Sequence, residues 1–172
     1  MKHHAKTMQM SNHAQQRIEQ LQLQPHPEGG FYREMHRASQ VVQSSGHAGS
    51  RHAYTTIYFL LPSGHHSAWH RVASDETWFS HEGCAVALYL LSPERGQIER
   101  QELGSGSGQF QFTVKANQWF AARPVAEASF CLVSCAVGPG FTFDDFELAT
   151  DEQMTQLLSA EDRPLGLSLL AG

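Results

Sequence analysis

Short stretches in which apolar and polar residues alternate recur through the middle of the chain, separated by turns rich in Gly, Pro, Asp and Ser. Alternation with a period of two puts every second side chain on one face, which is typical of β-strands. We expect about nine strands of this kind, at 30–37, 54–61, 67–72, 76–80, 85–91, 98–102, 110–114, 119–122 and 129–137. Many short strands with almost no helix between them favour an all-β barrel or sandwich.

Short helices are expected at the two ends of this all-β region. Ile18 and Leu21 give 12–23 a weak apolar stripe, and two prolines follow it. Near the end of the chain, Thr150 with Gln153 three residues later resembles a capping box. One helix therefore opens the domain and another closes it.

The length of 172 residues, without internal repeats or a linker, predicts a single domain at 1–172. We expect its core at about 20–149, a flexible loop at 43–50 and a mobile, polar terminus at 1–10. No apolar run is long enough for a membrane helix, and the first residues lack the apolar centre of a secretory signal. These features predict a cytoplasmic protein that does not bind membranes.

Charge and cysteine content narrow the function classes further. The formal charge is −5 and the 12 Lys and Arg residues are scattered, so we expect no nucleic-acid binding. Cys84, Cys131 and Cys135 are odd in number and show no C-x-x-C spacing. The prediction is three buried, reduced thiols.

The most informative segment is 64–83, which resembles the first cupin motif, G-x5-H-x-H-x3,4-E-x6-G. Gly64, His70, Glu76 and Gly83 are in register with it, and Val72 replaces the second histidine. Residues 70 and 72 share one face of a strand, and we expect Glu76 to begin the antiparallel neighbouring strand after a turn. His70 and Glu76 would then meet inside the barrel.

Metal-binding cupins, by this resemblance, use two histidines and the glutamate of that motif, and a histidine of a second motif, G-x5-P-x-G-x2-H. In the corresponding segment Lys115 replaces the proline, Asn117 the glycine and Phe120 the histidine. Non-haem iron sites need about three protein ligands. His70 and Glu76 alone would hold a divalent metal weakly, so we expect no cofactor.

Further segments, at 24–34, 55–61, 69–72, 75–78 and 138–146, are similar to an RmlC-like cupin subfamily classed as a domain of unknown function. That subfamily has been likened in shape to sugar-nucleotide epimerases and seed storage globulins. The resemblance implies a double-stranded β-helix, or jelly-roll barrel, with a small molecule bound in its mouth. It also implies a homodimer, which the segment 31–37 would favour if it lies at an open sheet edge.

His70 and Glu76 are the candidate catalytic residues, with Tyr58 as a further acid–base partner. A neutral imidazole that a carboxylate orients can transfer protons near pH 7. The alternative is a buried His–Glu hydrogen bond that only satisfies two polar groups.

The candidate ligand contacts have alternatives too. Only one of Arg33 and Glu34 can point inward, and an inward Arg33 could clamp a phosphate or carboxylate, whereas an outward one would make a surface salt bridge. Aromatic side chains could stack on a ligand or simply pack the core. The remaining candidates are Trp69, Trp78, Trp119, Phe120 and Arg51.

Three functions follow from this site. The first is a metal-independent isomerase or epimerase acting on a carbohydrate-like or acidic small molecule. The second is a binding protein that uses the same pocket without turnover. The third is a metallo-cupin whose reduced ligand set is completed by water or by His65 or His66.

Overall fold

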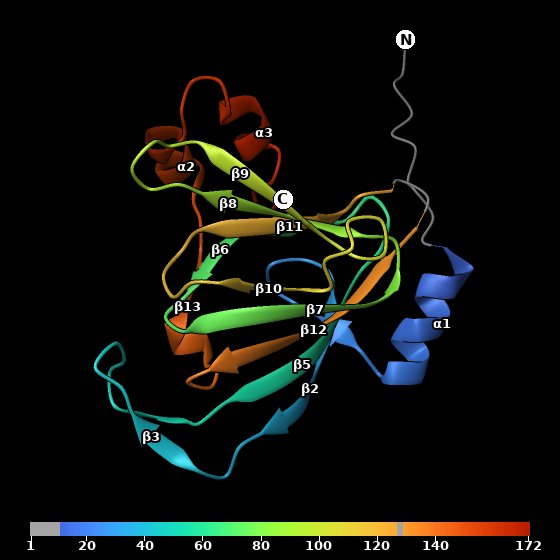
Figure 1. Ribbon diagram of the computed structural model, residues 1–172, viewed down its shortest axis with the longest axis vertical. Coiled ribbons are helices and arrows are strands. Elements are labelled where there is room, and N and C mark those ends of the chain that lie inside the picture. Colours follow the sequence, from blue (N-terminus) through green and yellow to red (C-terminus); the bar gives the residue numbers. More distant parts are fainter. Residues whose placement is uncertain (1–10, 127–128) are drawn as a thin grey trace.

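A computed structural model describes residues 11–126 and 129–172 of the chain. The mobile terminus expected at 1–10 lies outside them. Two curved antiparallel sheets face each other and enclose the core, with helices on their outer faces (Figure 1). The expected all-β barrel with short terminal helices is confirmed.

The first sheet has six strands, in the order β1-β2-β5-β12-β7-β10. Their bounds are β1 Gln24–Pro25, β2 Phe31–Arg37, β5 Thr55–Leu61, β12 Cys131–Gly138, β7 Asp75–Gly83 and β10 Gln111–Val114. The second sheet has five strands, in the order β13-β6-β11-β8-β9. Their bounds are β13 Phe146–Leu148, β6 Ser67–Val72, β11 Phe120–Pro124, β8 Val86–Leu91 and β9 Ile98–Leu103.

A separate hairpin of β3, Val41–Gln43, and β4, Ser50–His52, extends away from the barrel (Figure 1). The loop expected at 43–50 is the tip of this hairpin. Arg51, on β4, makes a bidentate ion pair with Asp145, at 2.6 and 2.8 Å. Asp145 belongs to a single 3-10 turn, η1, Phe143–Asp145, so this pair joins the hairpin to the segment that leads into β13.

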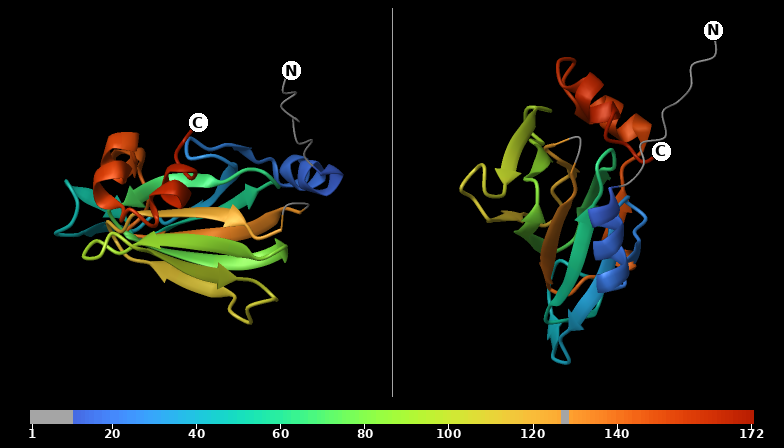
Figure 2. Two further views of the ribbon diagram at one scale, coloured as in Figure 1. Left: turned by 90° about the horizontal axis from the view of Figure 1, so that it is seen from above. Right: turned by 90° about the vertical axis from the view of Figure 1, so that its right-hand side faces the viewer.

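Helices cover the outer face of each sheet (Figure 2). Helix α1, Asn12–Leu21, buries Ala14 and Ile18 against the first sheet, beside Leu60. Helices α2, Asp151–Leu157, and α3, Arg163–Leu167, cover the second sheet. The capping box at Thr150 is confirmed, because its side chain accepts from the Gln153 backbone and the Gln153 side chain accepts from the Thr150 backbone. Helix α3 was not expected from the sequence.

Period-two alternation divides the apolar side chains between the interior and the outer faces. On β5, Phe59 faces the interior and Leu60 faces α1. On β11, Phe120 faces the interior, whereas Ala121 faces α2 and α3. Cys131 and Cys135 face the interior as free, buried thiols, and Cys84 is half-buried rather than buried as expected.

The expected pairing of the strands that carry His70 and Glu76 is wrong. Strand β6 pairs with β11 and β13, whereas β7 pairs with β12 and β10. The short turn between them crosses from one sheet to the other. His70 and Glu76 therefore reach the interior from opposite sheets.

One residue of the second motif region, Asn117, takes over the backbone role of the motif's glycine. Asn117 has a φ of 63°, the left-handed backbone that glycine adopts most readily and Asn tolerates better than other residues. Its N–H donates to the Val72 carbonyl, at 2.7 Å. The corner before β11 is thus built without the glycine of the motif.

Candidate functional site

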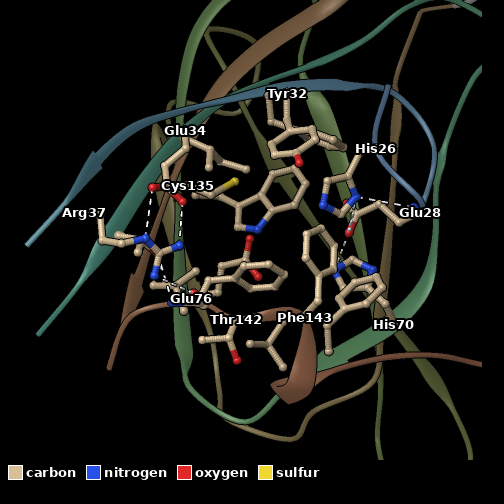
Figure 3. A pocket seen from close by; sticks show the side chains of 18 of the residues that line it. His26, Glu28, Tyr32, Glu34, Arg37, His70, Glu76, Cys135, Thr142 and Phe143 are labelled. Carbon is tan, nitrogen blue, oxygen red and sulfur yellow. Dashed lines mark hydrogen bonds and ion pairs between the residues drawn. The ribbon is translucent and has the colours of Figure 1, made fainter. Parts of the chain in front are cut away.

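A cavity of about 310 Å³ lies between the two sheets, next to the core. Polar side chains occupy two of its ends (Figure 3). His26, Glu28 and His70 lie together on one side, Arg37 and Glu34 lie on the other, and Glu76 lies between. Its remaining wall is mostly apolar and aromatic, and it also includes Gln24, Thr55 and Thr142.

The position of Glu28 depends on the turn before β2. The Glu28 carbonyl accepts from the Ala68 N–H, at 2.8 Å, which ties this turn to the start of β6. Gly29 has a φ of +106°, and a Cβ there would lie 2.2 Å from the His66 carbonyl oxygen. Only glycine fits this approach, and it delivers the Glu28 side chain to His70.

Glu28, not Glu76, is the carboxylate in contact with His70. His70 Nε2 lies 3.4 Å from Glu28 Oε2, and the Ser67 hydroxyl donates to Glu28 Oε1 at 2.8 Å. The structure records no hydrogen bond or ion pair between His70 and Glu76 among the described residues. The expected direct pair is therefore replaced by a different one.

The hydrogen bonds of His70 fix which ring nitrogen carries the proton. Nδ1 lies 2.7 Å from the Ala68 carbonyl oxygen, which can only accept, so Nδ1 carries a hydrogen. In neutral His70 the lone pair of Nε2 then faces the carboxyl of Glu28. A proton on Glu28 Oε2 avoids repulsion of lone pairs, and this oxygen faces both His70 Nε2, at 3.4 Å, and His26 Nδ1, at 3.3 Å.

Burial moves the pKa values of this pair toward each other. It raises the pKa of Glu28, which is 8% exposed, and lowers the pKa of His70, which is 1% exposed. Both shifts favour an uncharged pair over a separated ion pair. The favoured form of the pair is therefore a neutral His70 beside a protonated Glu28 carboxyl.

His26 completes this side of the cavity as a neutral ring. The Glu28 backbone N–H donates to His26 Nδ1, at 3.3 Å, so this nitrogen is an acceptor. Burial also lowers the pKa of His26. His26 stacks against Phe143, with ring centroids 5.9 Å apart.

Glu76 is a second carboxyl with an altered pKa. Burial, opposed by His70 and reinforced by Glu28, raises its pKa to about 7. It is consequently about half protonated at neutral pH. Trp78, two residues on along β7, lines the same cavity.

Of the other candidates from the sequence, Trp78 alone lines the cavity, and Phe120 borders it by packing against His70, with ring centroids 4.1 Å apart. Arg33 lies on the opposite face of β2 and donates to the Leu21 carbonyl, whereas its neighbour Glu34 points inward. Tyr58 also points outward, toward α1 and His81.

The other candidates are engaged elsewhere. Trp69 is in the core beneath α2 and α3 and donates to the Gly166 carbonyl. Trp119 packs in the same cluster beneath Arg71, and Arg51 is engaged by Asp145. Alternation along a strand shows which residues share a face, but it does not show which face points inward. The sequence therefore could not place these side chains correctly.

Sequence reasoning missed four polar residues of the cavity, His26, Glu28, Glu34 and Arg37. Glu28 occupies a Pro- and Gly-rich turn, where an acidic residue is usually solvated, so no local pattern distinguished it. The one available signal was strand alternation, because Glu34 and Arg37 fall on the inward face once β2 is oriented.

The residues of the cavity do not fit the metal site of metal-binding cupins. Hydrocarbon side chains, Val72 and Phe120, stand where two of the imidazoles would be. His65 and His66 do not line this cavity, and His66 Nε2 contacts the Leu170 carbonyl. Among the described residues no group of three or more His, Cys, Asp or Glu is arranged to hold a metal ion.

Comparisons with known proteins show the family and the fold. A family profile described as "Cupin superfamily (DUF985)" matches residues 15–149. The chain belongs to the cupin superfamily. No curated protein matches it.

Two solved structures resemble this cupin along almost the whole chain. A hypothetical protein from Leishmania major is 33% identical with a TM-score of 0.82, covering 92% of this chain and 99% of that one. A protein from Shewanella oneidensis is 35% identical with a TM-score of 0.80, covering 95% and 99%.

A more distant structure supports the fold alone. A cupin-2 domain from Rhodospirillum rubrum is 15% identical with a TM-score of 0.53, covering 87% of this chain and 95% of that one. Within the described residues of this cupin, none of the helices has the length and apolar character needed to cross a bilayer.

Proposed function

We propose that this cupin binds a small carbohydrate-like carbonyl compound in its cavity and isomerises or epimerises it by proton transfer, without a metal. The observation that carries the proposal is the contact between His70 Nε2 and Glu28 Oε2, at 3.4 Å, in the same cavity as Glu76. Ionisable groups with pKa values displaced by burial are typical of acid–base sites. The volume lies at the lower end for ligand pockets, which favours a ligand of about one sugar ring.

The groups are arranged for a reaction with a base and an acid. The His70–Glu28 pair takes the proton from the carbon beside the carbonyl, and the electron pair forms the carbon–carbon double bond of an enediol. The protonated form of Glu76 gives its proton to the carbonyl oxygen. Return of a proton to the other face of the first carbon, while the hydroxyl on the former carbonyl carbon gives its proton back to Glu76, yields the epimer. Return of the proton to the former carbonyl carbon, while the other enediol hydroxyl loses its proton to Glu76, yields the isomer.

Exchange with solvent tests this proposal directly. In D₂O, the enzyme should replace the hydrogen beside the carbonyl by deuterium in a panel of small aldoses, ketoses and their 2-amino derivatives, followed by proton NMR. His70→Ala should lower the exchange rate by about a hundredfold or more, since a positioned acid–base group contributes about that much. Treatment with a chelator should leave the rate unchanged.

The matched control is His81→Ala, because His81 lies on the outer face of the first sheet and bonds to Ser134. Loss of exchange on chelation would contradict metal independence. If a compound binds but no compound of the panel exchanges its hydrogen, the protein is a binding protein without turnover, which is the second function. The low exposure of His70, whose ring is packed against Phe120 and Phe146, favours that alternative.

A further inference from the structure

The charges around the cavity cancel in pairs, with one exception. Arg37 makes two bonds to Glu34, at 2.6 and 3.0 Å, and a third to the Phe141 carbonyl. Burial raises the pKa of Glu28 and lowers the pKa of His70, which favours the uncharged form of both. Because these four groups together carry no net charge, the net charge of the cavity depends on the remaining carboxyl.

Glu76 is that carboxyl. It is 7% exposed, and no Lys or Arg in the described chain forms an ion pair with it. Beside it, Trp78 Nε1 points its N–H toward the Glu76 carboxyl and lowers the pKa of Glu76, without forming a hydrogen bond of ordinary geometry. A buried carboxylate without a counter-charge is unfavourable.

The wall between the polar ends is mostly aromatic. The rings that line it belong to His26, Tyr32, Phe59, Trp78, Phe141, Phe143 and Phe146. Aromatic faces carry partial negative charge and attract ammonium groups, most strongly where water is excluded. A cation in this cavity is therefore attracted both by the faces of the aromatic rings and by the carboxylate of Glu76, which has no counter-charge.

We infer that the cavity takes a small organic cation, an amine or quaternary ammonium compound. The ammonium group lies against Glu76 and the rings. The inference concerns the same cavity as the proposed function but does not rest on it, because Glu76 is the proton donor in that reaction and the anionic partner of the cation here. It replaces the acidic ligand that an inward Arg33 would have supported.

An anionic ligand meets the opposite conditions. Arg37 is the one Lys or Arg side chain that lines the cavity within the described residues, and an anion would have to displace Glu34 from it. The same anion would lie close to Glu76. Phosphate and carboxylate compounds are consequently disfavoured.

Three probes of nearly equal shape test the charge preference. Choline is a quaternary ammonium alcohol, 3,3-dimethylbutan-1-ol is its uncharged counterpart, and 3,3-dimethylbutanoate carries a negative charge. Calorimetric titration above pH 7, where Glu76 is ionised, should give at least about tenfold tighter binding of choline than of either other probe. Tighter or equal binding of the alcohol or the carboxylate, or no binding of choline at millimolar concentration, would overturn the inference.

Substitutions test whether Glu76 and the aromatic wall cause the preference for the cation. Glu76→Gln should weaken choline binding by about tenfold while leaving the affinity for the alcohol unchanged. Glu94→Gln, at an exposed turn, is the matched control and should change neither. Phe143→Leu, at a half-exposed ring of the wall, should weaken choline binding more than alcohol binding without threatening the core. Equal effects of these variants on both probes would overturn the assignment.

The experiments can reject the proposed ligand class and the proposed reaction independently of each other. Preference for choline without deuterium exchange in any carbonyl compound would retain the cation site and reject the isomerase. Exchange in uncharged sugars without a preference for choline would do the reverse.

Discussion

At the residue scale, the chemistry of the cavity depends on where single side chains lie rather than on their type. Glu28 and Glu76 are both buried carboxyls, yet Glu28 contacts two imidazoles and the Ser67 hydroxyl, whereas Glu76 has no charged partner. Burial raises the pKa of both carboxyls, that of Glu76 to about 7. One carboxyl is thus suited to hold a proton and the other to meet a ligand.

The raised pKa of Glu76 has a consequence for stability. The folded protein holds this proton more tightly than the unfolded chain, whose carboxyl has an ordinary pKa of 4.5. The contribution of Glu76 to the free energy of unfolding is therefore largest below that value, and it falls as the pH rises through about 7. Desolvation is the largest cause, with His70 opposing it and Glu28 reinforcing it.

Glu76→Gln removes this pH dependence. Between about pH 5 and about pH 8, the free energy of unfolding of the variant should rise relative to the unchanged protein by on the order of 2 kcal/mol. Urea denaturation at both pH values measures it, with Glu94→Gln as the control. A difference that is the same at both values would mean that Glu76 titrates as an ordinary carboxyl.

At the scale of elements, the sequence predicted the strands better than their partners. The spans of β6 and β8 were expected to within one residue, because their alternation is uninterrupted and bounded by turns. Strands β1 and β13 and helix α3 were missed, since two to five residues are too few to show a period. The partners of β7 were wrong because a tight turn can close a hairpin or cross between sheets, and local sequence does not decide which.

The site was predictable to the extent that it lies on strands with a recognisable motif. His70, Glu76 and Trp78 follow from the motif and the period. Their roles remain predictions. The partner of His70 was not predictable, because Glu28 reaches it through a docked turn whose contacts are 39 residues apart in sequence.

That turn gives a prediction at Gly29. Gly29→Ala places a Cβ against the His66 carbonyl and forces a φ that alanine rarely adopts. The free energy of unfolding should fall by at least about 2 kcal/mol, measured by urea denaturation.

The control for Gly29→Ala is Gly46→Ala, where a Cβ meets nothing within 4 Å. It should change stability by less than about 0.5 kcal/mol. Equal effects of the two substitutions would show that the turn is free to move, and Glu28 with it.

At the scale of the whole molecule, β2 leaves part of a sheet edge open. Strand β1 pairs with its first two residues, Phe31 and Tyr32, and β5 occupies its other side. The backbone beyond Tyr32 has no strand partner on the outer side among the described residues, and Met35 is 47% exposed there. Edges of this kind are commonly covered by a second chain.

We expect a homodimer formed through this edge. Light scattering at micromolar concentration should give twice the mass of the chain, and Met35→Lys should shift it toward the monomer by placing a charge at the edge. Val41→Lys, at an exposed position of the separate hairpin, is the control and should leave the mass unchanged. A monomer for the unchanged protein would refute the expectation.

The left-handed backbone at Asn117 separates two properties that a motif search treats as one. The corner before β11 needs a residue that tolerates positive φ. Three residues later, the residue at position 120 determines whether an imidazole or a phenyl ring contacts His70. The first is a requirement of architecture and the second is a choice of chemistry. This chain therefore keeps the corner of the barrel with an asparagine while it carries a phenylalanine, rather than a histidine, at the last position of the motif.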